Sequence, residues 1–130
     1  MKSLPSSEIL GVVKDKGMLA RQLYLVTTVP TGDLSAIMPV LEDHLAYQVS
    51  LEAQGIMFAA GPNWTADETE WTGEGTVVIR ADSMAHATQL MEADPMHASG
   101  ARAFTFKPWL VNEGKLTVEL SYSTGRFVLA

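Results

Sequence analysis

The chain has 130 residues, of which 47% are hydrophobic and 18% charged, and its formal net charge is −6 at pH 7. This length and composition predict one folded domain with a sizeable core and exclude a disordered chain. The acidic balance excludes non-specific nucleic-acid binding, which needs a basic surface. The sequence has no cysteine, no apolar leader and no long apolar span. We therefore expect a cytoplasmic protein that uses neither disulfide nor thiolate chemistry and does not enter a membrane.

The chain begins with a short segment of mixed polarity. Residues 6–16 predict a helix that Ser6 or Ser7 would cap and that Gly17 would stop. We expect this N-terminal helical appendage, residues 1–19, to pack on the core or on a partner subunit.

The next two elements are a strand and a helix. Residues 23–29 are β-branched and aromatic and run into Pro30 and Gly32, so they predict a strand followed by a turn. An apolar stripe at three- and four-residue spacing then predicts an amphipathic helix, with Leu34, Ile37, Met38, Leu41, Leu45 and Val49 on one face. Because proline is tolerated only in the first helical turn, Pro39 indicates that the regular helix begins near Met38.

A second strand follows Gly55, which suits the left-handed position just past a helix end. The apolar run of residues 56–60 predicts a buried strand that Gly61 and Pro62 close. The polar stretch after it carries two tryptophans. We expect them either to pack as a satellite cluster or to line a pocket or a subunit contact.

The remaining core elements are a strand, a helix and a strand. Residues 76–80 predict the strand, and Asp82-Ser83 caps a helix that ends at Asp94-Pro95. Residues 96–100 form a connector. The alternating segment 102–107 predicts the last core strand, which stops at Pro108.

The order β-α-β-β-α-β predicts an α+β, ferredoxin-like plait whose antiparallel sheet carries helices on one face only. We expect a single domain over residues 1–130, with a core at about 20–110 and a C-terminal β-hairpin at 112–130. The other face of the sheet needs a cover, because Tyr24, Val26, Phe104 and Phe106 are unsuited to water. The cover would be a second copy in a homodimer, or the terminal hairpin of the same chain.

Short motifs are spread over residues 23–109. They are Glu42-Asp43-His44-Leu45, Gly55 with Ala60-Gly61-Pro62, the strand Gly75 to Arg80, Ala81-Asp82-Ser83, and Ala93-Asp94-Pro95 followed by Gly100. Together they resemble the YciI-like (YCII-related) proteins. The resemblance implies a dimeric α+β barrel and kinship with muconolactone isomerase and a chlorinated-hydroxyquinol dehydrochlorinase. It also implies a catalytic dyad of His44 and Asp94.

The residues themselves support a chemical role for this pair. His44 lies about a quarter-turn off the apolar stripe, where an imidazole can face a pocket and exchange protons near neutral pH. Asp94 is turned out of the helix by Pro95 and could orient His44 by accepting its ring N–H. The structural alternatives are a boundary histidine bonded to a backbone carbonyl and a carboxylate that bonds nearby amides.

Further residues are candidates for a binding wall. We expect substrate-binding contacts from Phe58, Gly61, Pro62, Trp64 and His97. Arg21, Arg80 and Arg102 could bind a carboxylate or phenolate, or pair with acidic residues at the surface. The three histidines lack metal-ligand spacing and no glycine-rich phosphate motif occurs, so we expect neither a metal nor a nucleotide cofactor.

Three hypotheses for the function follow. The first is a cofactor-free isomerase or lyase that acts on a small ring-derived acid, and it requires His44 and Asp94 to meet beside an open cavity. The second is a non-catalytic small-molecule-binding module, with a cavity and no such pair. The third is an accessory dimerisation module without a cavity.

Overall fold

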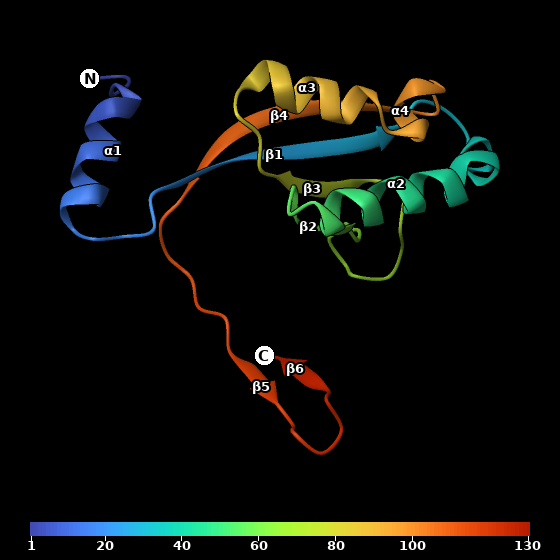
Figure 1. Ribbon diagram of the computed structural model, residues 1–130. Coiled ribbons are helices and arrows are strands. Elements are labelled where there is room, and N and C mark those ends of the chain that lie inside the picture. Colours follow the sequence, from blue (N-terminus) through green and yellow to red (C-terminus); the bar gives the residue numbers. More distant parts are fainter. The chain divides into compact units, whose positions relative to one another are not determined.

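The computed structural model describes all residues from 1 to 130. The chain forms two units, which we describe separately: a core unit, Gln22–Leu110, and a terminal unit made of Met1–Arg21 with Val111–Ala130. The core unit has the expected βαββαβ order (Figure 1).

A four-stranded sheet forms one layer of the core unit. Its strands are β1 (Arg21–Pro30), β2 (Met57–Pro62), β3 (Gly75–Ile79) and β4 (Arg102–Val111), and their order in the sheet is β2-β3-β1-β4. β3 pairs antiparallel with both β1 and β2. This arrangement confirms the predicted ferredoxin-like plait.

Helices form the second layer (Figure 1). Two short 3₁₀ turns, Leu34–Ala36 and Met38–Val40, precede α2 (Leu41–Ala53), and α3 (Met84–Glu92) precedes the one-turn α4 (Pro95–Ala98). The α-helix therefore begins at Leu41, three residues later than expected, because Pro39 starts a 3₁₀ turn instead. The expected connector at 96–100 is largely helical, because Asp94 and Pro95 together start a new helix.

The core lies between the helices and one face of the sheet. Tyr24 pairs with Ile79 and Val26 with Val77, and these four residues pack with Leu51, Ala87 and Met91 from the helices. Phe104 and Phe106 pack against the same cluster. The four aromatic and apolar residues for which we expected a second cover therefore face the helices, since strand residues alternate between faces. By the same alternation, Leu25, Val29 and Trp109 lie on the other face, where Val29 and Trp109 are exposed.

The buried side of α2 differs from the predicted stripe. Leu45 is 50% exposed and Val49 61% exposed. Leu41 faces inward as predicted, but the other inward positions are His44, Tyr47 and Leu51, which also follow three- and four-residue spacing. Hydrophobic spacing alone predicted the wrong face of α2, because the polar side chains of His44 and Tyr47 occupy two of the inward positions. His44 therefore lies on the inward face and not at its boundary.

The last core strand is longer than predicted. β4 continues through Pro108 to Val111. Proline has no N–H to donate to a sheet ladder, but β4 is an outermost strand, where that donor is dispensable.

The terminal unit contains a helix and a hairpin. α1 (Ser6–Asp15) follows Pro5, which is the N-cap and makes no side-chain capping bond, so the expected serine cap is wrong. β5 (Val118–Leu120) and β6 (Phe127–Leu129) form the expected antiparallel hairpin. None of the helices has the length and apolarity needed to cross a membrane.

The loop between β2 and β3 folds back on itself. Asn63 N–H and the indole N–H of Trp71 both donate to the Glu74 carbonyl, each over 2.9 Å. Gly73 has φ +98°, in the region that disfavours side chains. A methyl group at Gly73 would lie 2.7 Å from Leu34 Cδ2 and would also overlap Pro30. Glycine is thus the residue that lets this loop lie against the end of β1.

Gly73→Ala should destabilise the core unit by about 3 kcal/mol, because it adds both backbone strain and overpacking. Chemical denaturation with urea measures this loss. Gly32→Ala is the matched control, because a methyl there meets no atom within 4 Å and φ is not positive. Equal stability of the two variants would contradict the assignment.

Candidate functional site

A cavity of about 350 Å³ opens beside the N-terminal half of α2, within the core unit. Its wall is formed by Ile37 between the two 3₁₀ turns, by α2 and α4, by residues of all four strands and by the loop between β2 and β3. Its volume is at the lower end of the range for small-molecule sites, about 300–1,000 Å³. The polar side chains on the wall are few: Thr28, His44, Gln48, Glu74, Thr76, Asp94, His97 and Arg102. A few polar groups in a mainly apolar hollow are typical of a ligand site.

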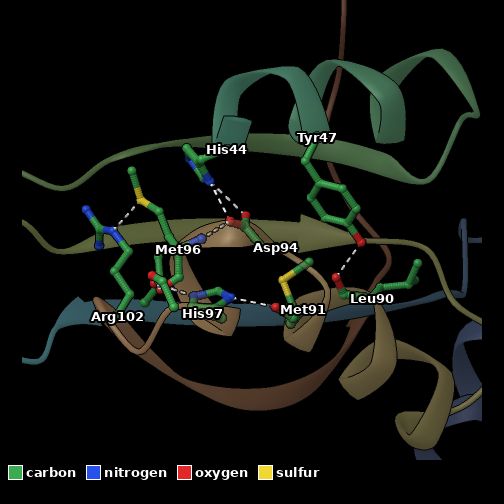
Figure 2. Close-up of polar contacts among 10 residues, drawn as sticks. His44, Tyr47, Leu90, Met91, Asp94, Met96, His97 and Arg102 are labelled. Atoms are coloured by element: carbon green, nitrogen blue, oxygen red, sulfur yellow. Dashed lines mark hydrogen bonds and ion pairs between the residues drawn. The ribbon is translucent and has the colours of Figure 1, made fainter. Parts of the chain in front are cut away.

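His44 and Asp94 meet at the wall of this cavity (Figure 2). His44 Nδ1 lies 2.9 Å from Oδ1 and 2.8 Å from Oδ2 of Asp94. Because a carboxylate can only accept, Nδ1 carries the hydrogen in this bond. His44 Nε2 is then the nitrogen with a free lone pair, and it has no partner within the protein.

The local sequence explains why Asp94 can reach His44. Pro95 keeps Asp94 extended, with φ −62° and ψ 126°, at the start of α4. There Asp94 Oδ1 also accepts the Met96 backbone N–H over 2.9 Å. The carboxylate is therefore both a helix cap and the partner of His44. The two roles that we weighed for Asp94 coexist.

Tyr47 fixes the helix that carries His44. Its hydroxyl donates to the Leu90 carbonyl at the end of α3 over 2.6 Å (Figure 2). Burial, and to a lesser extent the charge of Asp94, raise the pKa of Tyr47 above its usual value, so the hydroxyl keeps its proton. This bond ties α2 to α3 one helical turn beyond the dyad.

His97 forms a second polar chain on the same wall. Its Nδ1 lies 2.7 Å from the Met91 carbonyl, and its Nε2 lies 2.8 Å from Thr28 Oγ1. A carbonyl only accepts, so neutral His97 carries its hydrogen on Nδ1 and accepts the Thr28 hydroxyl hydrogen at Nε2. Thr28 Oγ1 therefore presents only lone pairs to the cavity. It can accept a hydrogen bond from a ligand hydroxyl.

The environment of His97 favours its neutral form. Burial is the main cause that lowers the pKa of His97 below 6.5, and electrostatic interactions with His44 and Arg102 add to it. The Met91 carbonyl and the Asp94 carboxylate act in the opposite direction. His97 also packs on Phe104, with ring centroids 4.6 Å apart.

Arg102 begins β4 and is buried, with 8% of its surface exposed. Its Nη1 donates to the Gly73 carbonyl over 2.6 Å and its Nε to Met96 Sδ over 3.2 Å. The guanidinium carbon lies 5.9 Å from the centre of the Trp71 ring. Burial lowers the pKa of Arg102 and the charge of Asp94 partly offsets this, but arginine remains charged in proteins.

Most of the predicted site residues meet at this cavity. His44, Asp94, Gly61, Pro62, Trp64 and His97 all line it. Phe58 does not, and this prediction is corrected: β2 shifts register between Met57 and Ala59, and the Phe58 ring lies 5.2 Å from the Arg80 guanidinium carbon instead. The bulge moves Phe58 out of the regular alternation.

Four polar residues of the wall were not predicted from the sequence, namely Thr28, Gln48, Glu74 and Thr76. Thr28 shares the alternation of Tyr24 and Val26, so the strand pattern indicates its inward direction. For Arg102 the sequence leaves both a ligand contact and a surface ion pair open, because no sequence signal marks a buried arginine. Its position directly after Gly100-Ala101, next to α4, is the only indication.

The wall offers no evident place for a metal ion, since no group of at least three His, Asp or Glu side chains comes together as potential ligands.

Comparisons with known proteins agree with the geometry. A family model described as the YCII-related domain matches residues 22–110. The chain is similar to the solved structure of 5-chloro-2-hydroxyhydroquinone dehydrochlorinase from Burkholderia phenoliruptrix AC1100, in complex with 2,5-dihydroxybenzoquinone. The sequence identity is 26%, the TM-score is 0.55, and the match covers 67% of this chain and 92% of the other. No curated protein sequence matches the chain.

The lowered pKa of His97 predicts a pH-dependent stability. The unfolded chain takes up a proton at His97 near pH 6.5, whereas the folded chain does so only at lower pH, so acid favours unfolding. Between about pH 7 and about pH 5 the parent should lose more unfolding free energy than His97→Gln, by at most about 1.4 kcal/mol per pH unit. Urea titrations at both pH values measure this. Equal losses in the two proteins would show that His97 is not held neutral.

Proposed function

We propose that this chain, which belongs to the YCII-related family, is a cofactor-free enzyme of the lyase or isomerase type that acts on a small ring-derived acid. His44 would move the proton and Asp94 would orient His44. The observation that carries this proposal is the bond of His44 Nδ1 to both carboxylate oxygens of Asp94, which leaves Nε2 free on the cavity wall.

The arrangement supports a definite first step. His44 Nε2 accepts a proton from a ring carbon beside a carbonyl, and the C–H electron pair passes into the ring as an enolate. The imidazolium that forms is stabilised by the Asp94 carboxylate at Nδ1. In an elimination, the enolate then expels an anionic leaving group from the neighbouring carbon. In an isomerisation, the imidazolium returns the proton to a different ring atom.

The substrate class has support from the cavity and from the similar structure. A hollow of about 350 Å³ fits a single substituted ring better than a nucleotide or a peptide. The dehydrochlorinase that resembles this chain acts, by its name, on a chlorinated hydroxyhydroquinone, and it is bound to a dihydroxybenzoquinone. Both compounds are single oxygenated rings.

The two alternative hypotheses predict different sites. A binding module without turnover has no need of a histidine whose tautomer a buried carboxylate fixes. An accessory dimerisation module has no need of a cavity. The presence of both features in one wall favours the enzyme, and the experiment below separates it from the binding module.

We also propose that the chain forms a homodimer through the sheet face opposite the helices. Exposed Val29 and Trp109 and partly buried Leu25 lie on this face. Face-to-face packing of two such sheets would remove them from water.

Substituting the dyad should abolish proton transfer. In D₂O, the parent should exchange the ring hydrogen of 5-chloro-2-hydroxyhydroquinone or a related small ring acid faster than buffer does, and ¹H NMR follows this exchange. His44→Gln should slow it by about 10²- to 10⁴-fold, because the proton acceptor is lost. Asp94→Asn should slow it as well, because the amide no longer fixes the Nδ1–H tautomer.

His86→Gln is the matched control, since His86 bonds the Asp82 backbone N–H at the surface and does not line the cavity. It should exchange at the parent's rate. If the parent binds these acids and yet exchanges no faster than buffer, the chain is a binding module and not an enzyme.

The proposed dimer predicts a sedimenting mass of twice 14.1 kDa. Ala103 is exposed and precedes the inward-facing Phe104, so Ala103→Arg places a charge on the proposed interface and should shift the protein to a monomer. Ala85→Arg, at an exposed position on α3, should leave the mass unchanged. A parent that sediments as a monomer would refute the proposed dimer.

A further inference from the structure

Arg102 is a buried cation without a counter-ion in the protein. With 8% of its surface exposed, it is almost fully removed from water. The ion pairs of this structure within 4 Å are His44 with Asp94 and His86 with Asp82, and neither involves Arg102. A buried charge is costly unless an opposite charge or hydrogen-bond acceptors compensate it. The guanidinium therefore lacks an ion-pair partner within the protein that would compensate its burial.

The protein provides hydrogen-bond acceptors for only some of the N–H groups of Arg102. Nη1 donates to the Gly73 carbonyl and Nε to the Met96 sulfur, which is a weak acceptor. Nη2 has no acceptor in the protein. The contacts to Gly73, Met96 and Trp71 hold the plane of the guanidinium in place. Its remaining N–H groups are thus oriented in advance and unused.

The free amino group is accessible to solvent. The only buried side-chain nitrogen or oxygen atom that is both sealed from solvent and unpaired is Asn112 Oδ1. Arg102 Nη2 is therefore still reached by solvent. Arg102 also lines the cavity, so a ligand bound there lies beside this side chain.

Met96 links Arg102 to the dyad (Figure 2). Its backbone N–H donates to Asp94 Oδ1, while its sulfur accepts the Arg102 Nε–H. Met96 therefore contacts both Asp94, which orients His44, and the guanidinium, and all four residues line the cavity.

Two carboxylates share the wall with Arg102. The Asp94 carboxylate is already bonded to His44 and to the Met96 N–H. Glu74 also lines the cavity, but its carboxylate accepts from the Asn63 side chain over 3.1 Å. Neither carboxylate forms an ion pair with the guanidinium, although the charge of Asp94 partly offsets its burial.

We propose that Arg102 is the anion-binding residue of this cavity and takes a carboxylate or ring oxyanion of the ligand through its free N–H groups. This inference rests on the proposed function and adds the substrate feature that the site selects, an oxyanion on the ring. The planar guanidinium suits such an oxygen pair, which it can bind with two parallel hydrogen bonds.

The test compares two ligands of nearly equal shape, benzoate and benzamide, by titration calorimetry with the parent protein near pH 7. Benzoate is an anion and benzamide is neutral. We expect benzoate to bind about 10-fold or more tightly than benzamide. In ¹H–¹⁵N spectra, the guanidinium signals of Arg102 should shift with benzoate and not with benzamide. Equal affinities, or no binding of either ligand, would overturn the proposal.

Variants then assign the effect to Arg102. Arg102→Gln should weaken benzoate binding by about 10- to 100-fold and leave benzamide within about 2-fold, and Arg102→Lys should fall between parent and Gln. Arg80→Gln, which makes the same charge change beside Phe58 and outside the cavity, should change neither affinity. If Arg102→Gln weakens both ligands equally, Arg102 only braces the loop at Gly73 and is not an anion site. The parent comparison stands even if a variant fails to fold.

Failure of this inference is distinguishable from failure of the proposed function. Hydrogen exchange that depends on His44, with equal binding of benzoate and benzamide, would overturn the role of Arg102 alone. Charge-dependent binding through Arg102 without exchange would overturn the enzyme and support the anion site.

Discussion

The buried carboxylate of Asp94 is the constraint on which the site depends. Its residue is 3% exposed, and a carboxylate so far from water must be hydrogen-bonded or paired. It meets this demand with the Met96 N–H, which starts α4, and with His44 Nδ1, which brings α2 against α4. One carboxylate thus determines where a helix begins, how two helices approach, and which nitrogen of His44 stays free.

The other polar side chains around Asp94 also have their donors and acceptors fixed by hydrogen bonds within the protein. His97 is held neutral between the Met91 carbonyl and the Thr28 hydroxyl. Its Nδ1–H is used by the carbonyl and its Nε2 accepts the Thr28 hydroxyl hydrogen, so Thr28 Oγ1 can only accept a hydrogen bond from a ligand. Arg102, in contrast, supplies donors and a positive charge. Acceptors and donors therefore lie at different places in one apolar hollow. A ligand that matches them has a hydroxyl at one position and an anionic oxygen at another.

The order of elements could be predicted because it depends on local signals, namely alternation, capping residues and turn residues. The pairing of His44 with Asp94 joins residues far apart in the sequence, and it was expected from the family resemblance. The prediction of the inward face of α2 was wrong, because hydrophobic spacing favours Leu45 and Val49 over His44 and Tyr47. His44 and Tyr47 can nevertheless face inward, because Asp94 and the Leu90 carbonyl accept their hydrogen bonds. Phe58 was wrong because a bulge is not visible in a sequence. The sequence left the role of Arg102 open, because nothing in it indicates that Gly73 and Met96 are the partners of this side chain.

Both outermost strands of the sheet carry a proline, Pro62 in β2 and Pro108 in β4. Each lacks the N–H that a docking strand would need, so neither edge offers an unbroken hydrogen-bonding template. Fibril-like growth by successive strand addition is therefore interrupted on both sides. A chain that is nearly half hydrophobic can in this way associate through the one sheet face that the helices leave free, while the edges of the sheet resist aggregation.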